Sequence, residues 1–401
     1  MADRPPVTTP NPKSEKESPL ASYSDRMTRF CNSIDGKADL IFFPIGTDLD
    51  YLTGLHREIP TYGRNLHPGG WLEGMWIAPG REPILTLPRM TAEFGSAGKI
   101  TGVDLRVLGD WDDPVQMVQG ILKDLGIGEG ATVAVSEDGE AEALMELQKL
   151  IPGVQFANGT KLLRPIRVIK DQDEIDLLRR AGEITEKAFA ATVKNLRMGM
   201  TELEISSEID YQMRAHGSLG PSFTTSLYNS GPDHPLRFGD KLGTWPRKLD
   251  KPVSVNFDFG AVLDGMCYDF GRTVAFGAPT DEQRLVHKLV MESQAAGIAA
   301  LKAGKVTCEQ VDKAARDVLE EAGYGKDFRH RLGHGIGWDV HEPPFLTKGD
   351  TTEVKEGMIF TIEPSIFRDM DFSARVEDCI VARPGGGEAL TSGFQELIVI
   401  E

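Results

Sequence analysis

The chain has 401 residues, more than one ordinary hydrophobic core accommodates, so two domains are expected. Its composition, 40% hydrophobic and 26% charged residues, is that of a globular protein. The net charge of -17 argues against a nucleic-acid partner and against an anionic membrane surface, since both repel an acidic protein.

Residues 1–20 are polar and rich in Pro, Ser and Lys, and they lack the apolar run of a signal peptide, which predicts a disordered tail. The cysteines show no CxxC spacing, which favours a reducing, cytoplasmic location and no thiolate metal site. They are Cys31, Cys267, Cys308 and Cys379. No apolar run approaches the length of a membrane span, so no membrane partner is expected.

Between residues 21 and 165, short apolar runs alternate with helical patterns. The predicted strands are Leu40–Phe43, Trp76–Ala78, Ile84–Leu87 and Val133–Val135. Residues 140–150 predict a helix. This alternation predicts an α/β N-terminal domain, smaller than the domain that follows it.

From 166 to 401 a second domain is expected, in which one layout occurs twice. A long helix begins after Asp171 and a shorter one after Thr201, each with an acidic residue three positions later that completes a capping box. The same pair recurs after Thr280 and Thr307. The repetition predicts a structural duplication inside one α+β domain with a mainly antiparallel sheet.

The stretch Val253–Thr273 is the centre of this second domain. Its alternating apolar residues predict a half-buried strand, and Asp264-Gly265 favours a two-residue hairpin turn because both residues tolerate positive φ. In that register Asp258 faces Gly271, and Asp269 becomes a diagonal cross-strand neighbour of Asp258. Two such carboxylates repel unless a cation or a proton lies between them. A solvated hairpin with acidic decoration is the alternative.

Three later stretches add candidate ligands. His334 lies between glycines, where the backbone can approach a ligand closely, although an ordinary glycine loop has the same pattern. Glu363 ends a predicted strand just before a proline, a place where solvated acids are also common. Arg375 and Glu377 share one face of a strand predicted over 373–381, where a cross-strand ion pair is the alternative.

Four carboxylates and one histidine carry more negative charge than one small cation neutralises. Such an oxygen-rich set suits two divalent ions such as Mn, Fe or Co better than a closed tetrahedral zinc site. Two neighbouring ions can share carboxylates and a hydroxide, which lowers the pKa of that water.

Taken in chain order, these motifs resemble those of the pita-bread metallopeptidases, the family of methionine aminopeptidase, aminopeptidase P and prolidase. The motifs are Asp258-Phe-Gly, Asp269-Phe-Gly-Arg-Thr, His334-Gly-Ile-Gly, Ile-Glu363-Pro and Arg-Val-Glu377-Asp. The N-terminal domain points to the branch of prolidase, aminopeptidase P and creatinase. The resemblance implies an α+β pita-bread catalytic domain, preceded by a creatinase-like α/β domain.

The resemblance also implies roles for the ligands. Asp258 would chelate one metal, while Asp269 and Glu377 would bridge both ions. His334 and Glu363 would complete the site of the second ion. Manganese is the first choice for the two divalent ions, with cobalt, iron and zinc as alternatives.

Four residues receive catalytic or substrate-binding roles in the same way. Glu363 would also shuttle the proton from the attacking water to the leaving amine. His341 matches the histidine that polarises the scissile carbonyl, an electrophilic role. Arg375 matches a position associated with the Xaa-Pro-cleaving branch, and we expect it to fix a substrate carboxylate. His234 is the candidate for the second substrate histidine, followed by a long segment, 235–252.

The implied function is hydrolysis of the bond before proline in Xaa-Pro dipeptides or short Xaa-Pro peptides by a two-metal enzyme. We expect a small peptide substrate and a homodimer. Two alternatives stay open: a creatinase-like hydrolase of a small non-peptide amide or amidine, and a catalytically dead peptide-binding module. All five ligand positions are occupied, which argues against the dead module.

Overall fold

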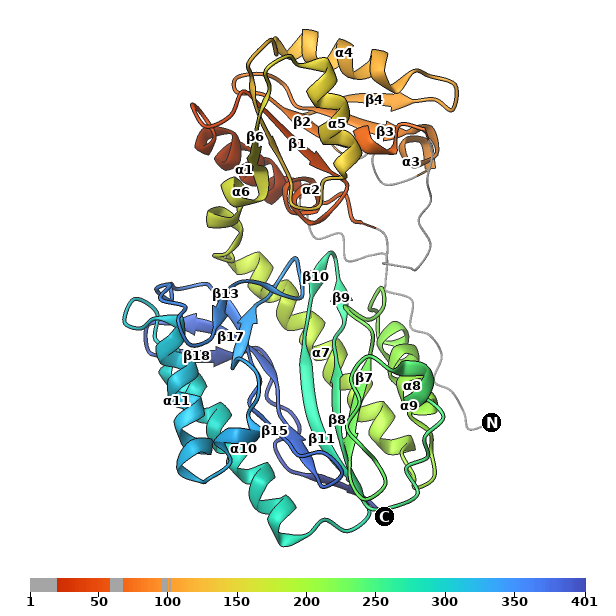
Figure 1. The fold of residues 1–401 in the computed structure, drawn as a ribbon, viewed down its shortest axis with the longest axis vertical. Coiled ribbons are helices and arrows are strands. Elements are labelled where there is room, and N and C mark those ends of the chain that lie inside the picture. The colour runs from red at the N-terminus through yellow and green to blue at the C-terminus, as the bar shows by residue number, and fades with distance from the viewer. Residues whose placement is uncertain (1–19, 58–67, 95–99, 101) are drawn as a thin grey trace. The chain divides into compact units, whose positions relative to one another are not determined.

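The computed structural model describes residues 20–57, 68–94, 100 and 102–401, so the tail predicted over 1–20 lies almost wholly outside the described residues. The described chain falls into two compact units, 20–167 and 168–401 (Figure 1). None of the described helices combines the length and the apolar character that crossing a bilayer requires.

The N-terminal unit is built on a six-stranded mixed sheet with the order β4-β3-β2-β1-β5-β6. The strands are β1 Leu40–Pro44, β2 Gly74–Ile77, β3 Ile84–Pro88, β4 Asp104–Leu108, β5 Thr132–Val135 and β6 Gln155–Asn158. The helices are α1 Leu20–Ser33, α2 Thr47–Thr53, α3 Arg89–Phe94, α4 Pro114–Leu125, α5 Ala141–Leu150 and α6 Gly159–Arg167. The pairs β1/β2 and β2/β3 are antiparallel, and the others are parallel.

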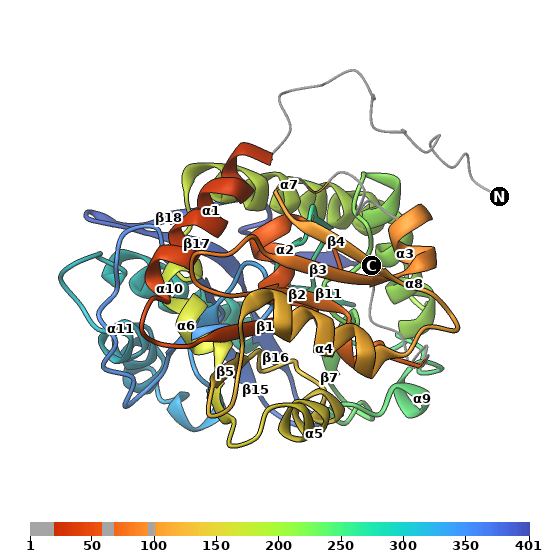
Figure 2. The same ribbon diagram turned by 90° about the horizontal axis from the view of Figure 1, so that it is seen from above.

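Alternate side chains of β1 explain how helices come to cover both faces of this sheet. Phe42 belongs to a buried cluster with residues of α4 and α5. Phe43 points to the opposite face and packs on Phe30 of α1, with 5.4 Å between ring centroids. Figure 2 shows α1 and α2 on one side of the strands and α4 and α5 on the other.

The C-terminal unit consists of two similar halves, each with a long and a short helix against a mainly antiparallel sheet (Figure 1). The helices are α7 Gln172–Asn195, α8 Glu202–Ala215, α9 Lys241–Thr244, α10 Asp281–Ala300 and α11 Cys308–Glu321. The first sheet has the order β19-β11-β8-β7, with β7 Ser226–Ser230, β8 Val253–Phe259, β11 Phe270–Phe276 and β19 Ile398–Ile400. The second has the order β13-β12-β14-β17-β18, with β12 Gly333–Gly335, β13 Glu342–Leu346, β14 Ile359–Ile362, β17 Asp378–Arg383 and β18 Gly386–Ala389.

The four predicted helices begin where their capping residues stand. In each, the side chain at the third helical position accepts a hydrogen bond from the backbone N–H of the capping residue, as the capping box requires. The capping residues are Asp171, Thr201, Thr280 and Thr307. The predicted duplication of helix pairs is therefore confirmed.

The hairpin between β8 and β11 has the predicted register. Asp258 pairs with Gly271, and Asp264 and Gly265 have positive φ at the turn, beyond the short pair β9 Val262–Leu263 and β10 Met266–Cys267. The prediction that β8 is half-buried was wrong, because every residue from Val253 to Phe259 is buried. One face packs on α7 through Phe189, and the other contacts β16, Ser373–Arg375.

The strand predicted over 373–381 is interrupted. It forms β16, which pairs with β15 Ser365–Phe367, and then β17, which belongs to the five-stranded sheet. Val376 and Glu377 lie at the break between the two strands. The break lets Glu377 meet β11, where it forms an isolated bridge with Gly271.

Candidate active site

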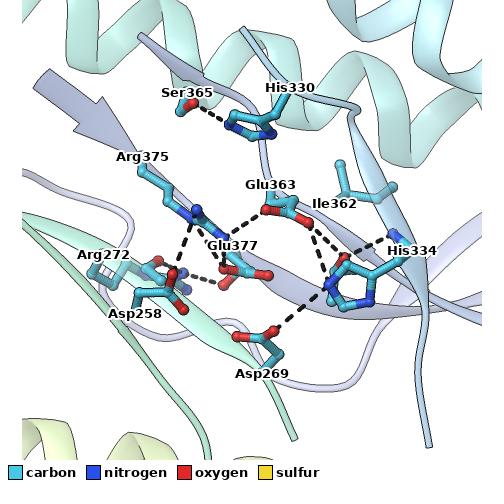
Figure 3. A network of polar contacts seen from close by, with 12 residues as sticks. Asp258, Asp269, Arg272, His330, His334, Ile362, Glu363, Ser365, Arg375 and Glu377 are labelled. Atoms are coloured by element: carbon cyan, nitrogen blue, oxygen red, sulfur yellow. Dashed lines mark hydrogen bonds and ion pairs between the residues drawn. The ribbon is translucent and has the colours of Figure 1, made fainter. Parts of the chain in front are cut away.

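The five predicted ligands come from the ends and breaks of strands in both halves of the C-terminal unit. Asp258 lies near the end of β8, and Asp269 directly precedes β11. His334 is the middle residue of β12, Glu363 directly follows β14, and Glu377 lies between β16 and β17. Figure 3 shows their side chains pointing toward one another.

Ligand atoms of these residues form groups in which all atoms lie within 4.8 Å of one another. One group contains Asp258, Asp269 and Glu377, a second contains His334, Glu363 and Glu377, and a third contains Asp269, His334 and His341. The Nε2 atom of His334 is 3.4 Å from Glu363 Oε1 and 3.7 Å from Asp269 Oδ2, which links the first two groups. Asp269 and Glu377 thus lie between the others.

Two glycines allow this convergence. A Cβ atom on Gly271 would lie 2.9 Å from Glu377 Cβ, and one on Gly333 would lie 1.9 Å from the Thr361 carbonyl oxygen. Any larger residue would separate the strands at these two points. Gly333, next to His334, therefore lets β14 come close. Gly271, two residues after Asp269, lets Glu377 come close.

Backbone contacts fix Glu377 independently of its side chain. Glu377 and Gly271 exchange two N–H to O hydrogen bonds of 3.0 and 3.2 Å. The buried Arg272 donates from Nη1 to the Glu377 carbonyl at 2.8 Å and from Nη2 to Asp378 Oδ1 at 2.8 Å. The backbone of Glu377 is thus held in place by the fold, which sets where its carboxylate begins.

His334 is oriented as a metal-ligating histidine. Its Nδ1 lies 3.0 Å from the Gly335 carbonyl oxygen, an acceptor, so Nδ1 carries the proton and Nε2 keeps its lone pair. Burial and the neighbouring His341 lower the pKa of His334 well below its usual value, which keeps the ring neutral. The free lone pair faces the carboxylates of Asp269 and Glu363.

Burial disfavours the ionised form of all four carboxyl groups. Burial raises the pKa of Asp269 and of Glu377 well above the usual carboxyl value, and the neighbouring acids raise both further. Burial also raises the pKa of Asp258, and that of Glu363 to about 7, although the Arg375 guanidinium opposes both shifts. One guanidinium does not neutralise four carboxylates.

Two oxygens in this group lack partners. Asp269 Oδ1 and Glu377 Oε1 are buried and have no hydrogen-bond partner among the described residues. Buried carboxylate oxygens without partners are costly, and divalent cations bind such oxygens. The donor set consists of four carboxylates and one imidazole nitrogen. It therefore fits divalent metal ions.

Arg375 adopts the ion-pair alternative. Its Nη2 is 2.6 Å from Glu363 Oε2 and 2.7 Å from Glu377 Oε2, its Nε is 3.2 Å from the same Glu377 oxygen, and its Nη1 is 3.5 Å from Asp258 Oδ2. Each of its nitrogens thus faces a carboxylate of the ligand group. Arg375 lines the pocket, but this geometry offers no support for the expected contact with a substrate carboxylate.

A pocket of about 1050 Å³ opens onto the ligand group. Its lining includes Asp258, Asp269 and Glu363, so the carboxylates are reachable from the pocket. Aromatic and aliphatic side chains form much of the remaining wall, together with three arginines and two histidines. A pocket of this size and mixed character accommodates a small organic substrate rather than an ion alone.

His341 lines the pocket beside the ligand group, and its ring centroid is 3.9 Å from that of His334. The Arg331 Nη2 lies 3.1 Å from His341 Nδ1. A guanidinium only donates, so Nδ1 accepts and the ring proton belongs to Nε2. Partial burial and the Arg331 charge lower the pKa of His341 to about 4, so the neutral ring has an N–H to donate.

Arg331 and His330 are among the pocket residues that the sequence patterns did not indicate. The His330 Nε2 contacts Ser365 Oγ, and Nδ1 lies 2.7 Å from the Arg331 carbonyl oxygen. Burial and the charge of Arg375 lower the pKa of His330 to about 3. Its position four residues before His334 in His-Arg-Leu-Gly-His was the one available signal.

His234 does not join the site. Its Nε2 lies 3.0 Å from the Lys248 carbonyl oxygen and its Nδ1 3.2 Å from that of Pro232, and it is absent from the pocket lining. Both ring nitrogens are occupied by the segment that follows β7. The expected substrate-binding role of His234 finds no support in this geometry.

Comparison with known proteins agrees with the geometry. The model of metallopeptidase family M24 matches residues 176–384, more than half of the chain. A putative dipeptidase of Bacillus subtilis is 32% identical over 87% of this chain and 92% of its own length. The Xaa-Pro dipeptidase of Pyrococcus horikoshii is 30% identical over 81% of this chain and 88% of its own.

Solved structures match over nearly the whole chain. A dipeptidase from Pyrococcus horikoshii has a TM-score of 0.80 and 28% identity, and the match covers 94% of this chain and all of that one. A prolidase from Thermococcus sibiricus has a TM-score of 0.82 and 27% identity, covering 94% of this chain and 99% of that one. The predicted α+β pita-bread fold is thus confirmed, and the chain belongs to metallopeptidase family M24.

Proposed function

We propose that this metallopeptidase hydrolyses the bond before proline in Xaa-Pro dipeptides or short Xaa-Pro peptides. The observation that carries the proposal is a buried group of four carboxylates and one histidine, with unpartnered oxygens, on the wall of a large pocket. Relatives named Xaa-Pro dipeptidase and solved prolidases support the substrate class.

Five side chains would hold two divalent ions. They are Asp258, Asp269, His334, Glu363 and Glu377. Asp269 and Glu377 are the bridging candidates, because their ligand atoms take part in groups on both sides and each has an unpartnered oxygen. When bound, the ions would polarise the scissile carbonyl and lower the pKa of the attacking water.

The protein's own side chains supply orientation and proton transfer. Glu363 lines the pocket and is the candidate proton shuttle between the attacking water and the leaving amine. His341 would donate from Nε2 to the oxygen of the scissile carbonyl, because Arg331 occupies Nδ1. Arg375 would hold the ligand carboxylates of Glu363 and Glu377 in place.

Arg331 is a better anchor than Arg375 for the substrate carboxylate. It lines the pocket, its Nε is buried without a hydrogen-bond partner among the described residues, and its guanidinium lies 4.9 Å from the centre of the Phe345 ring. A guanidinium with a spare N–H binds a carboxylate through directed hydrogen bonds.

The proposal includes manganese as the metal, a homodimer and a cytoplasmic location. Manganese is supported because it suits carboxylate-rich donor sets. The resemblance to the prolidase branch supports the homodimer, and the four free cysteines support the cytoplasmic location. Metal analysis of the purified protein tests the metal, and light scattering tests the homodimer.

A panel of substrates tests the function. Manganese-loaded protein should cleave Xaa-Pro dipeptides, and chelation should abolish the cleavage. Cleavage of a small guanidino amide, with Xaa-Pro peptides left intact, would favour a creatinase-like hydrolase instead. Binding of Xaa-Pro peptides without any turnover would favour the peptide-binding module.

A further inference from the structure

The segment between β7 and β8 forms part of the pocket. Its sequence indicated only that the segment is long. Leu236 and Phe238 of this segment line the pocket, together with Tyr228 of β7 and Phe367 of β15. A chain segment outside the ligand motifs thus contributes to the substrate site.

Three aromatic rings form one continuous wall. The Phe238 ring centroid lies 4.6 Å from that of Tyr228 and 5.9 Å from that of Phe367, and the last two are 6.3 Å apart. These are ordinary aromatic contact distances. Phe238 lines the pocket and is nevertheless 59% exposed, so much of its side chain stays uncovered. An open apolar ring in a pocket favours an apolar ligand group.

The wall is held in place before any ligand binds. The Leu236 N–H donates to Asp369 Oδ1 at 2.7 Å, and Arg247 Nη1 donates to the Pro235 carbonyl at 2.8 Å. Lys241 Nζ donates to the backbone just before β7 at 3.1 Å. These contacts flank Phe238 on both sides along the chain. A preformed surface binds with less loss of conformational entropy than a mobile one.

The substrate's direction is inferred from the strands that carry the carboxylate anchor and the aromatic wall. Arg331 and Phe345 belong to the β12–β13 side, whereas Tyr228 and Phe238 belong to the β7–β8 side. The ligand group joins both sides, because Asp258 comes from β8 and His334 from β12. A dipeptide whose carboxylate met Arg331 and whose scissile bond lay at the ligand group would extend its first side chain toward the β7–β8 side of the pocket.

We propose that the aromatic wall of Tyr228, Leu236, Phe238 and Phe367 is the subsite for the residue before proline, and that it selects large apolar side chains there. The inference rests on the proposed Xaa-Pro hydrolysis. Phe238 is the residue that determines this specificity, because it is the exposed member of the wall and lies on the segment between β7 and β8.

The test is the ratio of kcat/KM for Phe-Pro to that for Gly-Pro, measured with manganese-loaded protein. We expect the unchanged protein to prefer Phe-Pro, and Phe238→Ala to lower the ratio by about 10-fold or more, mainly through KM for Phe-Pro, since a lost apolar contact costs roughly 10–200-fold in discrimination. Phe238→Leu should restore part of the ratio. The control Leu242→Ala alters a side chain of the same segment that is 83% exposed and outside the pocket lining, so it should keep the ratio.

Three outcomes would overturn the inference: a preference of the unchanged protein for Gly-Pro, an unaltered ratio in Phe238→Ala, or an equal loss in Leu242→Ala. If the unchanged protein cleaves no Xaa-Pro dipeptide, the proposed function fails, and calorimetric binding of Phe-Pro and Gly-Pro replaces the rates. Equal affinities of the two dipeptides, or no binding, would then overturn the subsite as well.

Discussion

Two buried acidic centres in this molecule differ in how the protein compensates their charge. In the N-terminal unit, Asp48 accepts hydrogen bonds from Ser136 Oγ at 3.0 Å and Thr160 Oγ1 at 2.5 Å, and its other oxygen lies 3.1 Å from Arg167 Nη1. In the C-terminal unit, Arg375 contacts three of the four ligand carboxylates, those of Asp258, Glu363 and Glu377, and Asp269 and Glu377 each keep an unpartnered oxygen.

The difference separates structural charge from functional charge. A buried carboxylate with a cation and hydrogen bonds is satisfied by the fold, and removing it leaves its partners unsatisfied. A buried group with excess negative charge and unpartnered oxygens is costly to the folded protein unless a cation binds. The first kind of centre holds a domain together, and the second kind recruits metal ions.

Asp269→Asn should have the largest effect. The amide keeps the shape but removes a charge from between the two groups, so we expect metal binding and peptidase activity to be lost. The metal-free variant should fold at least as stably as the unchanged metal-free protein, because a repelled carboxylate has been removed. Metal analysis, turnover of Xaa-Pro dipeptides and denaturant unfolding check these results. Two bound ions and normal turnover in the variant would show that Asp269 is not a bridge.

Asp48→Asn should lower the stability of the protein and leave its metal binding unchanged. Breaking a buried ion pair from one side costs about 3–5 kcal/mol of unfolding free energy, because the arginine loses its carboxylate. Denaturant unfolding, monitored for the N-terminal unit, measures this loss. The metal content should match that of the unchanged protein. A stability unchanged by the substitution would mean that the contact with Arg167 contributes little.

His341→Ala tests whether a residue at the edge of the ligand group acts on the substrate or binds metal. His341 lies beside His334, yet its Nδ1 already accepts from Arg331, so it should act on the substrate and not as a ligand. We expect kcat to fall about 10²–10³-fold, as for loss of a donor to a developing oxyanion. Metal content should stay normal. Loss of metal would instead make His341 a ligand.

The metal-free protein should lose stability as the pH rises above about 7. Its ligand carboxyls have pKa values above those of the unfolded chain, about 7 for Glu363, so the folded state holds protons that the unfolded chain has lost. The buried histidines act in the opposite direction at lower pH, because their pKa values are lowered, to about 3 for His330 and about 4 for His341. Above about pH 7 the histidines of the unfolded chain are largely neutral, so only the carboxyls still change the unfolding free energy. Unfolding curves with a chelator measure the fall, and saturating manganese should remove it. A stability of the metal-free protein that rises above about pH 7 would contradict the excess of buried charge.

Local sequence patterns predicted much of the fold. The turn residues Asp264 and Gly265 specify the register of the hairpin, because positive φ at both positions allows only a tight turn there. The capping boxes located the helix starts for a similar local reason. β4 and β6 were missed because they are edge strands with exposed residues, so they lack an apolar run.

Contacts between distant residues were beyond the sequence patterns. β8 is buried on both faces because β16 packs on its polar face, and a period of two indicates only one apolar face. The ligands were found because glycines and prolines mark them, and the pairing of Arg375 with acids was foreseen as an alternative. Arg331 and His330 acquire their roles from His341 and Ser365, and no local pattern indicates those contacts.

Anomalous diffraction at the manganese edge, from crystals grown with excess manganese, would locate the metal ions directly. We predict two peaks within the group of Asp258, Asp269, His334, Glu363 and Glu377, with Asp269 and Glu377 between them, and no peak at Asp48. No peak in the ligand group, or peaks only elsewhere in the protein, would contradict the claim that uncompensated buried charge marks the metal centre.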